Sequence, residues 1–371
     1  MSSHKQRDLN EQIPIAEPLV EVRRGAITES RHRGHVVAVK PDGNPDGNIV
    51  AYLGDPANVT YLRSSAKPLQ ALPLLISGAA EHFGFTDQEV ALACGSHSGE
   101  AIHTATVASM LRKIGLGPDA LKCGTHEPFS LEVSRELRAR GEQPNVLQNN
   151  CSGKHAGMLA LALHLNAPIE NYDSAQNPVQ LAIGRIVAQF SSVPLEDISI
   201  GIDGCGVPVF GTTVRAMALA YARLVSTPVE FEKPIRDACQ RIVRAMTAYP
   251  ELIGGTTERL DTEIMRAAKG RVVSKVGAEG VYTAGVLPCE EWPNGLGLAL
   301  MIEDGDDHRA RPTVVIESLR QLGVLHDESL EAVSRYAFFP VRNRRDEIVG
   351  EIRASFLLRR PEEHSQDFFD A

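Results

Sequence analysis

Hydrophobic positions follow a strand-like period at both ends of the chain. Residues Leu19–Arg24 alternate between apolar and polar side chains, and an Asp-Gly-rich turn separates His35–Lys40 from Asn48–Leu53. Asp-Gly between β-rich runs is typical of a hairpin, here with a long loop. Toward the end, β-branched or alternating runs return at Arg271–Lys275, Gly280–Leu287, Leu296–Ile302 and Ile348–Phe356. Both ends are therefore predicted to form strands.

The middle of the chain has apolar residues at three- and four-residue spacing, which predicts helices. The predicted helices are Lys67–His82, Ile102–Ile114, Leu131–Arg140, Gly153–Leu165, Pro178–Phe190, Thr213–Leu224 and Pro228–Ala248. Strands at both ends of a helical middle predict an α/β (α+β) fold, with one mainly antiparallel sheet and flanking helices. We expect one domain over residues 16–358, between a polar leader (1–15) and a polar tail (359–371).

Composition narrows the class of protein. The 371 residues are 43% hydrophobic, which is enough for a large core, and the net charge of −9 argues against a nucleic-acid-binding protein. The longest apolar runs are too short for a membrane span, and the polar start has no secretory signal, so a cytoplasmic location is expected. Six scattered cysteines without a Cys-x-x-Cys pair do not indicate a disulfide framework.

The first candidate for chemistry is Ser64-Ser65-Ala66-Lys67. Positions three apart share one face of a helical turn, so Lys67 can lie near the Ser64 hydroxyl. Serine becomes a nucleophile when a base takes its proton, and a buried lysine with a lowered pKa can be that base. The alternative is that Ser64 caps a helix and Lys67 lies in solvent.

A second candidate is Ser96 in the segment Gly95-Ser96-His97-Ser98-Gly99. The glycines allow the backbone to approach a ligand closely, although Ser96 or Ser98 could instead cap the helix that follows. Lys275 stands at the end of an apolar strand, before a glycine-rich turn. A lysine there is costly unless it is paired, or unless its amine reaches water at a sheet edge.

A third candidate is Cys151, which begins a predicted helix and is followed by Lys154 and His155 on the same face. Cys205 follows a predicted strand in Asp203-Gly-Cys205-Gly. Two thiolates, an imidazole and a water would complete a tetrahedral zinc site, and this chemistry favours His155 as the third ligand. The alternative is two unrelated, reduced cysteines.

Taken together and in this order, these motifs resemble the rhizobial type of L-asparaginase, the asparaginase II family. The resemblance rests on Arg63-Ser64-Ser65-Ala-Lys67-Pro, Cys94-Gly-Ser96-His97-Ser-Gly-Glu, Asn150-Cys151-Ser-Gly-Lys154-His155, Asp203-Gly-Cys205-Gly-Val-Pro and Lys275-Val-Gly-Ala-Glu-Gly. It extends from about Glu21 to Phe356. It implies a fold similar to serine β-lactamases and glutaminases, and a homodimer.

The resemblance also implies a role for each site residue. Ser64 is the expected nucleophile with Lys67 as its base, and Ser96 with Lys275 forms a second serine–lysine tandem. Zinc is expected to bind Cys151, Lys154 and Cys205. Arg63, His155 and Asp203 are expected to line the site and bind substrate. One departure is that Leu260 and Asp261 stand where the family carries adjacent cysteines.

The implied reaction is hydrolysis of the side-chain amide of L-asparagine through an ester on Ser64. A glutaminase, or an enzyme that accepts both amides, is an alternative because one methylene gives only about 1–3 kcal/mol of discrimination. A penicillin-binding or β-lactamase-like acyl enzyme and a zinc-stabilised binding protein without catalysis are two further alternatives. Ammonia release from asparagine separates them.

Overall fold

The computed structural model describes residues 15–41 and 44–361. Apart from Ile15, the predicted leader lies outside the described residues, and so does the predicted tail beyond residue 361. At the start of that predicted tail, Arg359 exchanges two backbone hydrogen bonds, both of 2.8 Å, with Tyr52. This pairing fastens the last described residues to the sheet.

The large sheet is antiparallel, as predicted. Its eight strands within the described residues have the order β10-β11-β1-β2-β9-β8-β7, with β3 also paired to β2. A three-stranded sheet, β4-β6-β5, lies apart from it. The strands are β1 (Glu17–Arg24), β2 (Ile27–Lys40), β3 (Asn48–Leu53), β4 (Val59–Tyr61), β5 (Ser199–Ile202), β6 (Pro208–Thr213), β7 (Val272–Val276), β8 (Val281–Val286), β9 (Leu296–Ile302), β10 (Phe338–Arg342) and β11 (Ile348–Ala354).

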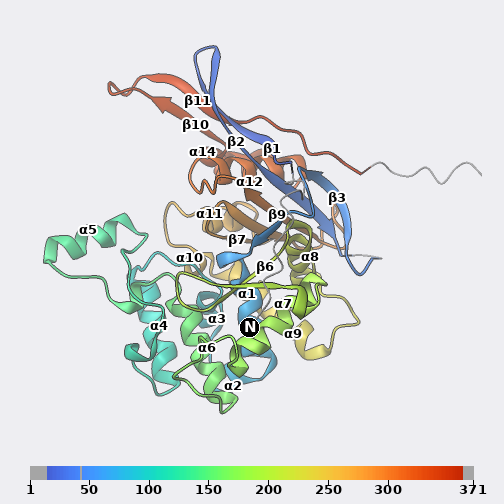
Figure 1. Cartoon of the computed structure of the whole chain (residues 1–371). Helices are drawn as coiled ribbons and strands as arrows, with labels where there is room; N and C mark the ends of the chain where they lie inside the picture. The colour runs from blue at the N-terminus through green and yellow to red at the C-terminus, as the bar shows by residue number, and fades with distance from the viewer. Residues whose placement is uncertain (1–14, 42–43, 362–371) are drawn as a thin grey trace, which may run out of the picture.

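Helices cover the sheet and form a separate helical layer. Figure 1 shows the sheet in the upper part of the molecule and α1 to α10 gathered mostly below it. The helices are α1 (Lys67–Ile76), α2 (Ala79–His82), α3 (Asp87–Ala93), α4 (Ala101–Lys113), α5 (Leu131–Arg140), α6 (Ser152–His164), α7 (Pro178–Ser191), α8 (Val214–Val225), α9 (Lys233–Ala248), α10 (Pro250–Ile253), α11 (Leu260–Ala267), α12 (Ala310–Gln321), α13 (Asp327–Ala332) and α14 (Ser334–Ala337).

Two apolar cores hold these layers together. The larger one contains Leu69 and Leu72 of α1 and Met217 of α8, and it joins the helical layer to one face of the sheet. The second contains Leu298 of β9 and Val315 of α12 on the opposite face. Both faces of the central strands are therefore buried, which explains their nearly continuous apolar sequence.

Close packing of α8 on the sheet depends on a glycine. A Cβ atom built on Gly297 of β9 would lie 1.8 Å from the Ala218 carbonyl oxygen of α8. No side chain fits at that distance, so the glycine sets how closely this helix can approach. The approach also places Tyr221 of α8 beneath the turn that carries Ser64, where its hydroxyl donates to Ser65 O at 2.7 Å.

The observed helices differ from the predicted ones mainly at their ends. The predicted helix Lys67–His82 is broken at Gly78, whose φ of 81° reverses the chain between α1 and α2. The last predicted helix begins at Lys233 rather than Pro228, with a proline in its first turn. Helices α3, α10, α13 and α14 were missed because each has seven residues or fewer, which is too few to show a helical period; α11 and α12 were missed as well.

Candidate active site

The turn that carries Ser64 connects β4 to α1. It is a 3₁₀ turn, Arg63–Ala66, and Arg63 enters it with a left-handed φ of 52°. Such a conformation is uncommon for a residue with a side chain and persists only where the surroundings fix it. Here Ser65 Oγ donates to Leu62 O at 2.7 Å, and Tyr221 holds the Ser65 carbonyl. The turn is therefore rigid and presents Ser64, which is partly exposed.

Lys67 is buried at the start of α1 and is 1% exposed. Its Nζ donates to Gly95 O at 2.7 Å, to Ser96 Oγ at 2.9 Å and to Asn150 O at 3.2 Å. Burial lowers the pKa of Lys67, partly opposed by the nearby sulfur of Cys151. The alternative of a solvated lysine is wrong, and the site holds an amine whose neutral form is favoured by burial.

Ser96 lies in the loop between α3 and α4, where Gly95 to Gly99 are all buried. Its N–H donates to Ile253 O at 2.8 Å, and its carbonyl accepts from Arg259 at 2.9 Å. Ser96 caps no helix, because the N-cap of α4 is Glu100. The backbone of Ser96 is thus fixed on both sides, and its hydroxyl faces Lys67.

The two predicted serine–lysine pairs are connected differently in the structure. Lys67 is bonded to Ser96, and in residues 15–41 and 44–361 no hydrogen bond joins the side chains of Ser64 and Lys67 or of Ser96 and Lys275. Lys275 instead donates to Val276 O at 3.0 Å and reaches Asp261 Oδ2 at 3.4 Å. Catalytic hydrogen bonds are often incomplete before substrate binds, so the roles predicted for these residues stay predictions.

Lys275 is on the edge strand β7 but is 0% exposed, so the alternative of an amine in water is wrong. Burial lowers its pKa to about 7, while the charge of Asp261 acts in the opposite direction. The edge of β7 is covered by α11, which brings Asp261 to Lys275. An amine with a pKa near neutrality can either donate or accept a proton at physiological pH.

Ser64 and Ser96 line one cavity of about 480 Å³. Its wall also includes Asn150, Arg259 and Asp261, which the sequence did not single out as site residues. Asn150 precedes a predicted zinc ligand, and Asp261 stood out only as a departure from the family pattern. Arg259 had no signal of its own, because one arginine in a polar loop is common. The cavity is large enough for a small amino acid.

Arg259 is a firmly held cation on the wall of this cavity. Its guanidinium donates to Ser98 Oγ at 2.8 Å and to the carbonyl of Ser96 at 2.9 Å. Its Cζ lies 5.2 Å from the centre of the Phe129 ring, a cation–π distance. A guanidinium held in this way can bind a carboxylate with little loss of side-chain entropy.

Cys151, Lys154 and Cys205 meet at the start of α6. Lys154 Nζ donates to Cys205 Sγ at 3.0 Å, and the thiols of Cys151 and Cys205 are hydrogen-bonded to each other. That bond from Cys205, together with the lysine charges, holds the pKa of Cys151 well below its usual range. Burial lowers the pKa of Lys154, but the two sulfurs outweigh it and raise the pKa overall. The cluster thus combines a thiolate with a cation.

Zinc in proteins is usually bound by four donors from Cys, His, Asp or Glu side chains and water. No group of three or more His, Cys, Asp or Glu side chains suited to a metal occurs in the described part of the chain. His155 does not join the two cysteines in such a group: its Nδ1 is bonded to the Tyr172 hydroxyl at 2.8 Å, and its buried Nε2 has no partner among the described residues. Two sulfurs and the Lys154 nitrogen nevertheless converge, so the donors fit zinc only with Lys154 as the third ligand.

Arg63 and Asp203 form an ion pair, with Arg63 Nε 3.0 Å from Asp203 Oδ1. Burial raises the pKa of Asp203, but the charges of Lys154 and Arg63 and a bond from the Gly204 N–H outweigh burial and lower it overall. Asp203 therefore connects the Ser64 turn to the cysteine cluster. The substrate-binding roles of Arg63, His155 and Asp203 stay predictions.

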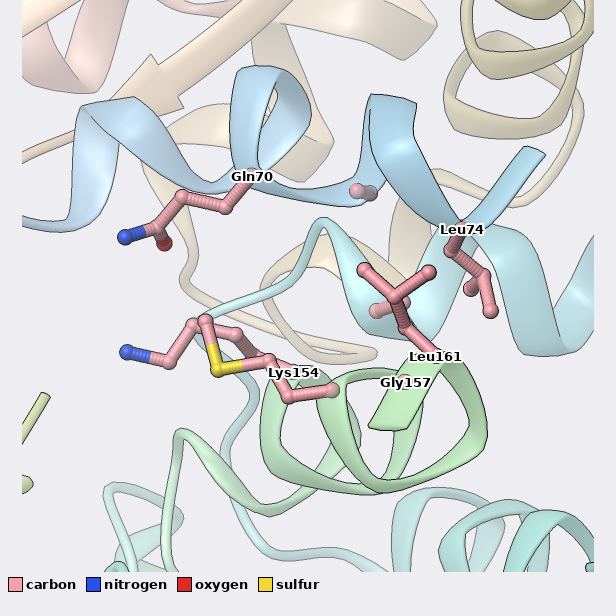
Figure 2. Close-up of a pocket in the computed structure, with 8 residues that line it drawn as sticks. Gln70, Leu74, Lys154, Gly157 and Leu161 are labelled. Carbon is pink, nitrogen blue, oxygen red and sulfur yellow. The ribbon is translucent and has the colours of Figure 1, made fainter. Parts of the chain in front are cut away.

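Lys154 also lines a second, much smaller cavity between α1 and α6. Figure 2 shows Gln70 of α1 and Lys154 of α6 extending in the same direction, with Leu74, Gly157 and Leu161 behind them. The volume of this cavity is about 10 Å³, which is close to the limit for one water molecule. It is too small for a substrate. A third cavity of about 390 Å³, between α11 and α13, has none of the predicted site residues on its wall, so the cavity at Ser64 is the candidate active site.

Comparisons with known proteins give a family match and distant structural neighbours. The family model "L-asparaginase II" matches residues 20–354. The fold is similar to a probable glutaminase from Bacillus subtilis (13% identity, 78% of this chain, 84% of that chain, TM-score 0.37) and a beta-lactamase from Burkholderia vietnamiensis (14%, 82%, 93%, 0.34). No curated protein matches the sequence.

These findings define the chain as an amidohydrolase with a mixed α/β fold. It belongs to the L-asparaginase II family, as the resemblance of its motifs predicted. No helix among the described residues is long and apolar enough to cross a membrane.

Proposed function

We propose that this enzyme is an L-asparaginase that hydrolyses the side-chain amide of L-asparagine to L-aspartate and ammonia. The observation that carries this proposal is the position of Lys67. Its buried amine is bonded to Ser96, and Ser96 and Ser64 line the same cavity. Family membership supports the choice of an amide of this class as the substrate.

In the proposed reaction Ser64 Oγ attacks the amide carbon as its proton passes to Lys67. Ser96, bonded to Lys67, delivers that proton to the amide nitrogen, so ammonia leaves and an aspartyl ester remains on Ser64. Water then attacks the ester, giving L-aspartate and the free serine. Lys275 assists proton transfer in this second step. Acid–base help of this kind contributes roughly 10²–10⁴ in rate.

The charges on the cavity wall suit the two ends of a free amino acid. Arg259, fixed by Ser98 and Ser96, is the proposed partner of the α-carboxylate. Glu258 also lines the cavity and can attract the α-ammonium group, whereas Asp307 on the same wall is already paired with Arg311. Opposite charges attract more strongly at the wall of such a cavity than in bulk water. The arrangement therefore favours an amino-acid amide over a neutral amide.

We also propose that Cys151, Lys154 and Cys205 hold a zinc ion. When bound, the metal would hold these three side chains in one fixed geometry next to the cavity, which would help to position the substrate. Loss of zinc is then expected to raise KM or lower stability more than it abolishes turnover. A homodimer in the cytoplasm, acting on a small molecule, is the expected setting for the enzyme.

The direct test of this proposal is a coupled ammonia assay on the wild type and on Ser64→Ala. Removal of an activated nucleophile costs on the order of 10⁶ in kcat, so ammonia release should fall nearly to background. Ser109→Ala removes a hydroxyl that is bonded to Glu89, away from the cavity, and this variant should keep turnover. Near wild-type ammonia release from Ser64→Ala would refute the assignment.

A further inference from the structure

Asp261 is a buried carboxylate that the reaction above does not use. It lies in the first turn of α11, is 1% exposed and lines the cavity that contains Ser64. Its Oδ1 accepts from Ser274 Oγ at 2.8 Å, and its Oδ2 accepts from the Val276 N–H at 3.0 Å. These two donors flank Lys275 on β7, so they fix the carboxylate directly beside that lysine.

The contact between Asp261 and Lys275 is the longest of the three. Lys275 Nζ lies 3.4 Å from Oδ2, whereas a tight charge-assisted bond between an ammonium and a carboxylate measures roughly 2.7–2.9 Å. The two donors on β7 hold the carboxylate firmly, whereas the carboxylate holds the Lys275 amine only loosely. Lys275 can therefore move toward the substrate without leaving Asp261 unbonded.

The charged groups around Lys275 have opposite effects on its pKa, and Asp261 is the one that raises it. Lys67 from α1 and Arg259 from the segment before α11 disfavour a second cation, and Asp261 favours it. Thr283 is the cross-strand partner of Lys275. The adjacent Tyr282 forms a hydrogen bond with Ser274 through its hydroxyl, and the Cys94 thiol at the end of α3 is also nearby. Burial raises the pKa of both Tyr282 and Cys94, so each is neutral at physiological pH.

We propose that Asp261 is a positioning residue for Lys275, which holds the amine beside the cavity and sets the pH at which the amine releases its proton. This inference rests on the proposed hydrolysis at Ser64. Asp261 also caps the edge of β7, and a residue with that structural role alone would affect stability without affecting the titration of Lys275.

The test is Asp261→Asn, which keeps an acceptor for the Val276 N–H and removes the charge. An opposite charge at this range shifts a pKa by about 1–3 units, so the lysine titration should move down by about that amount. The titration is followed by NMR of protein labelled with ¹³C at the lysine ε carbon, with Lys275→Arg assigning the signal. The acid limb of kcat/KM should move in the same direction, with the main loss in kcat rather than KM.

The matched control is Tyr282→Phe, which removes a buried hydroxyl from the same network without changing charge. It should lower Tm and leave the Lys275 titration in place. If Asp261→Asn does not fold, Asp261→Ser provides the same charge removal. An unchanged Lys275 titration in a folded variant overturns the inference, whether or not asparagine is hydrolysed. A shifted titration in an enzyme that releases no ammonia supports it and refutes the proposed function alone.

Discussion

Lys67 Nζ donates a 2.9 Å hydrogen bond to Ser96 Oγ, although the two residues come from different elements, α1 and the loop after α3. Two backbone carbonyls, of Gly95 and Asn150, fix the same amine. In the proposed reaction, Ser96 is the hydroxyl through which this lysine reaches the leaving group. It would then connect the base of the nucleophile to the departing ammonia.

Ser96→Ala is expected to lower kcat by about 10²–10⁴ and to leave KM within a few-fold, because the hydroxyl acts on the proton rather than on substrate binding. Steady-state kinetics with asparagine measure both constants. A variant with normal kcat and raised KM would make Ser96 a binding residue instead. Ser109→Ala, whose hydroxyl is bonded to Glu89 away from the cavity, serves as a control.

Arg259→Met is expected to raise KM for asparagine at least ten-fold, because the proposed partner of the α-carboxylate is lost. Breaking a charge-assisted contact of this kind costs roughly 1.5–3 kcal/mol. Arg266→Met, in the same helix region but half exposed and paired with Glu251, should leave KM unchanged. An effect on kcat alone would contradict the binding role of Arg259.

The pH dependence of stability follows from Lys275. Its pKa of about 7 in the folded protein lies below the ordinary value of 10.5 that applies to the unfolded chain. Between these values the unfolded chain binds more protons, so the free energy of unfolding rises with pH from about 7 upward and is lowest below 7. Urea denaturation at a series of pH values measures this slope, which Lys275→Met should make shallower. An equal slope in both proteins would show that Lys275 titrates normally.

Zinc binding is expected at one ion per chain, and Cys151→Ser or Cys205→Ser should abolish it. Elemental analysis of dialysed protein gives the stoichiometry independently of activity. Cys239→Ser changes a buried thiol in α9 and should retain the metal. Full zinc content in both ligand variants would place the metal elsewhere or show that it binds without these thiols.

The fold was predictable to the extent that its segments have a clear period. β9 was predicted with its observed ends, because Leu296–Ile302 is a continuous apolar run between turn residues. Helix α12 packs against the sheet and α14, and its buried residues include the polar Thr313 and Ser318, which obscures the helical period of its sequence. At Gly78 the pattern predicted too much helix: a single residue in the left-handed conformation divides the continuous helical pattern into two helices.

The sequence indicated a set of candidate site residues but not the contacts among them. Motif order indicated Ser64, Lys67, Ser96 and Lys275, whose roles stay predictions, and it did not indicate the observed bond between Lys67 and Ser96. Chemistry alone favoured His155 over Lys154, but a tyrosine hydroxyl holds the imidazole away from the thiols. Such choices depend on tertiary neighbours that no local pattern encodes.

The central claim is that Ser64 forms an ester with the substrate, and rapid acid quenching followed by peptide mass spectrometry tests it most directly. During turnover of asparagine, the peptide that contains Ser64 should carry the added mass of one aspartyl group, and Ser64→Ala should show none. An unmodified Ser64 peptide under conditions where ammonia is released in a burst, or an aspartyl group on Ser96 instead, would contradict the account.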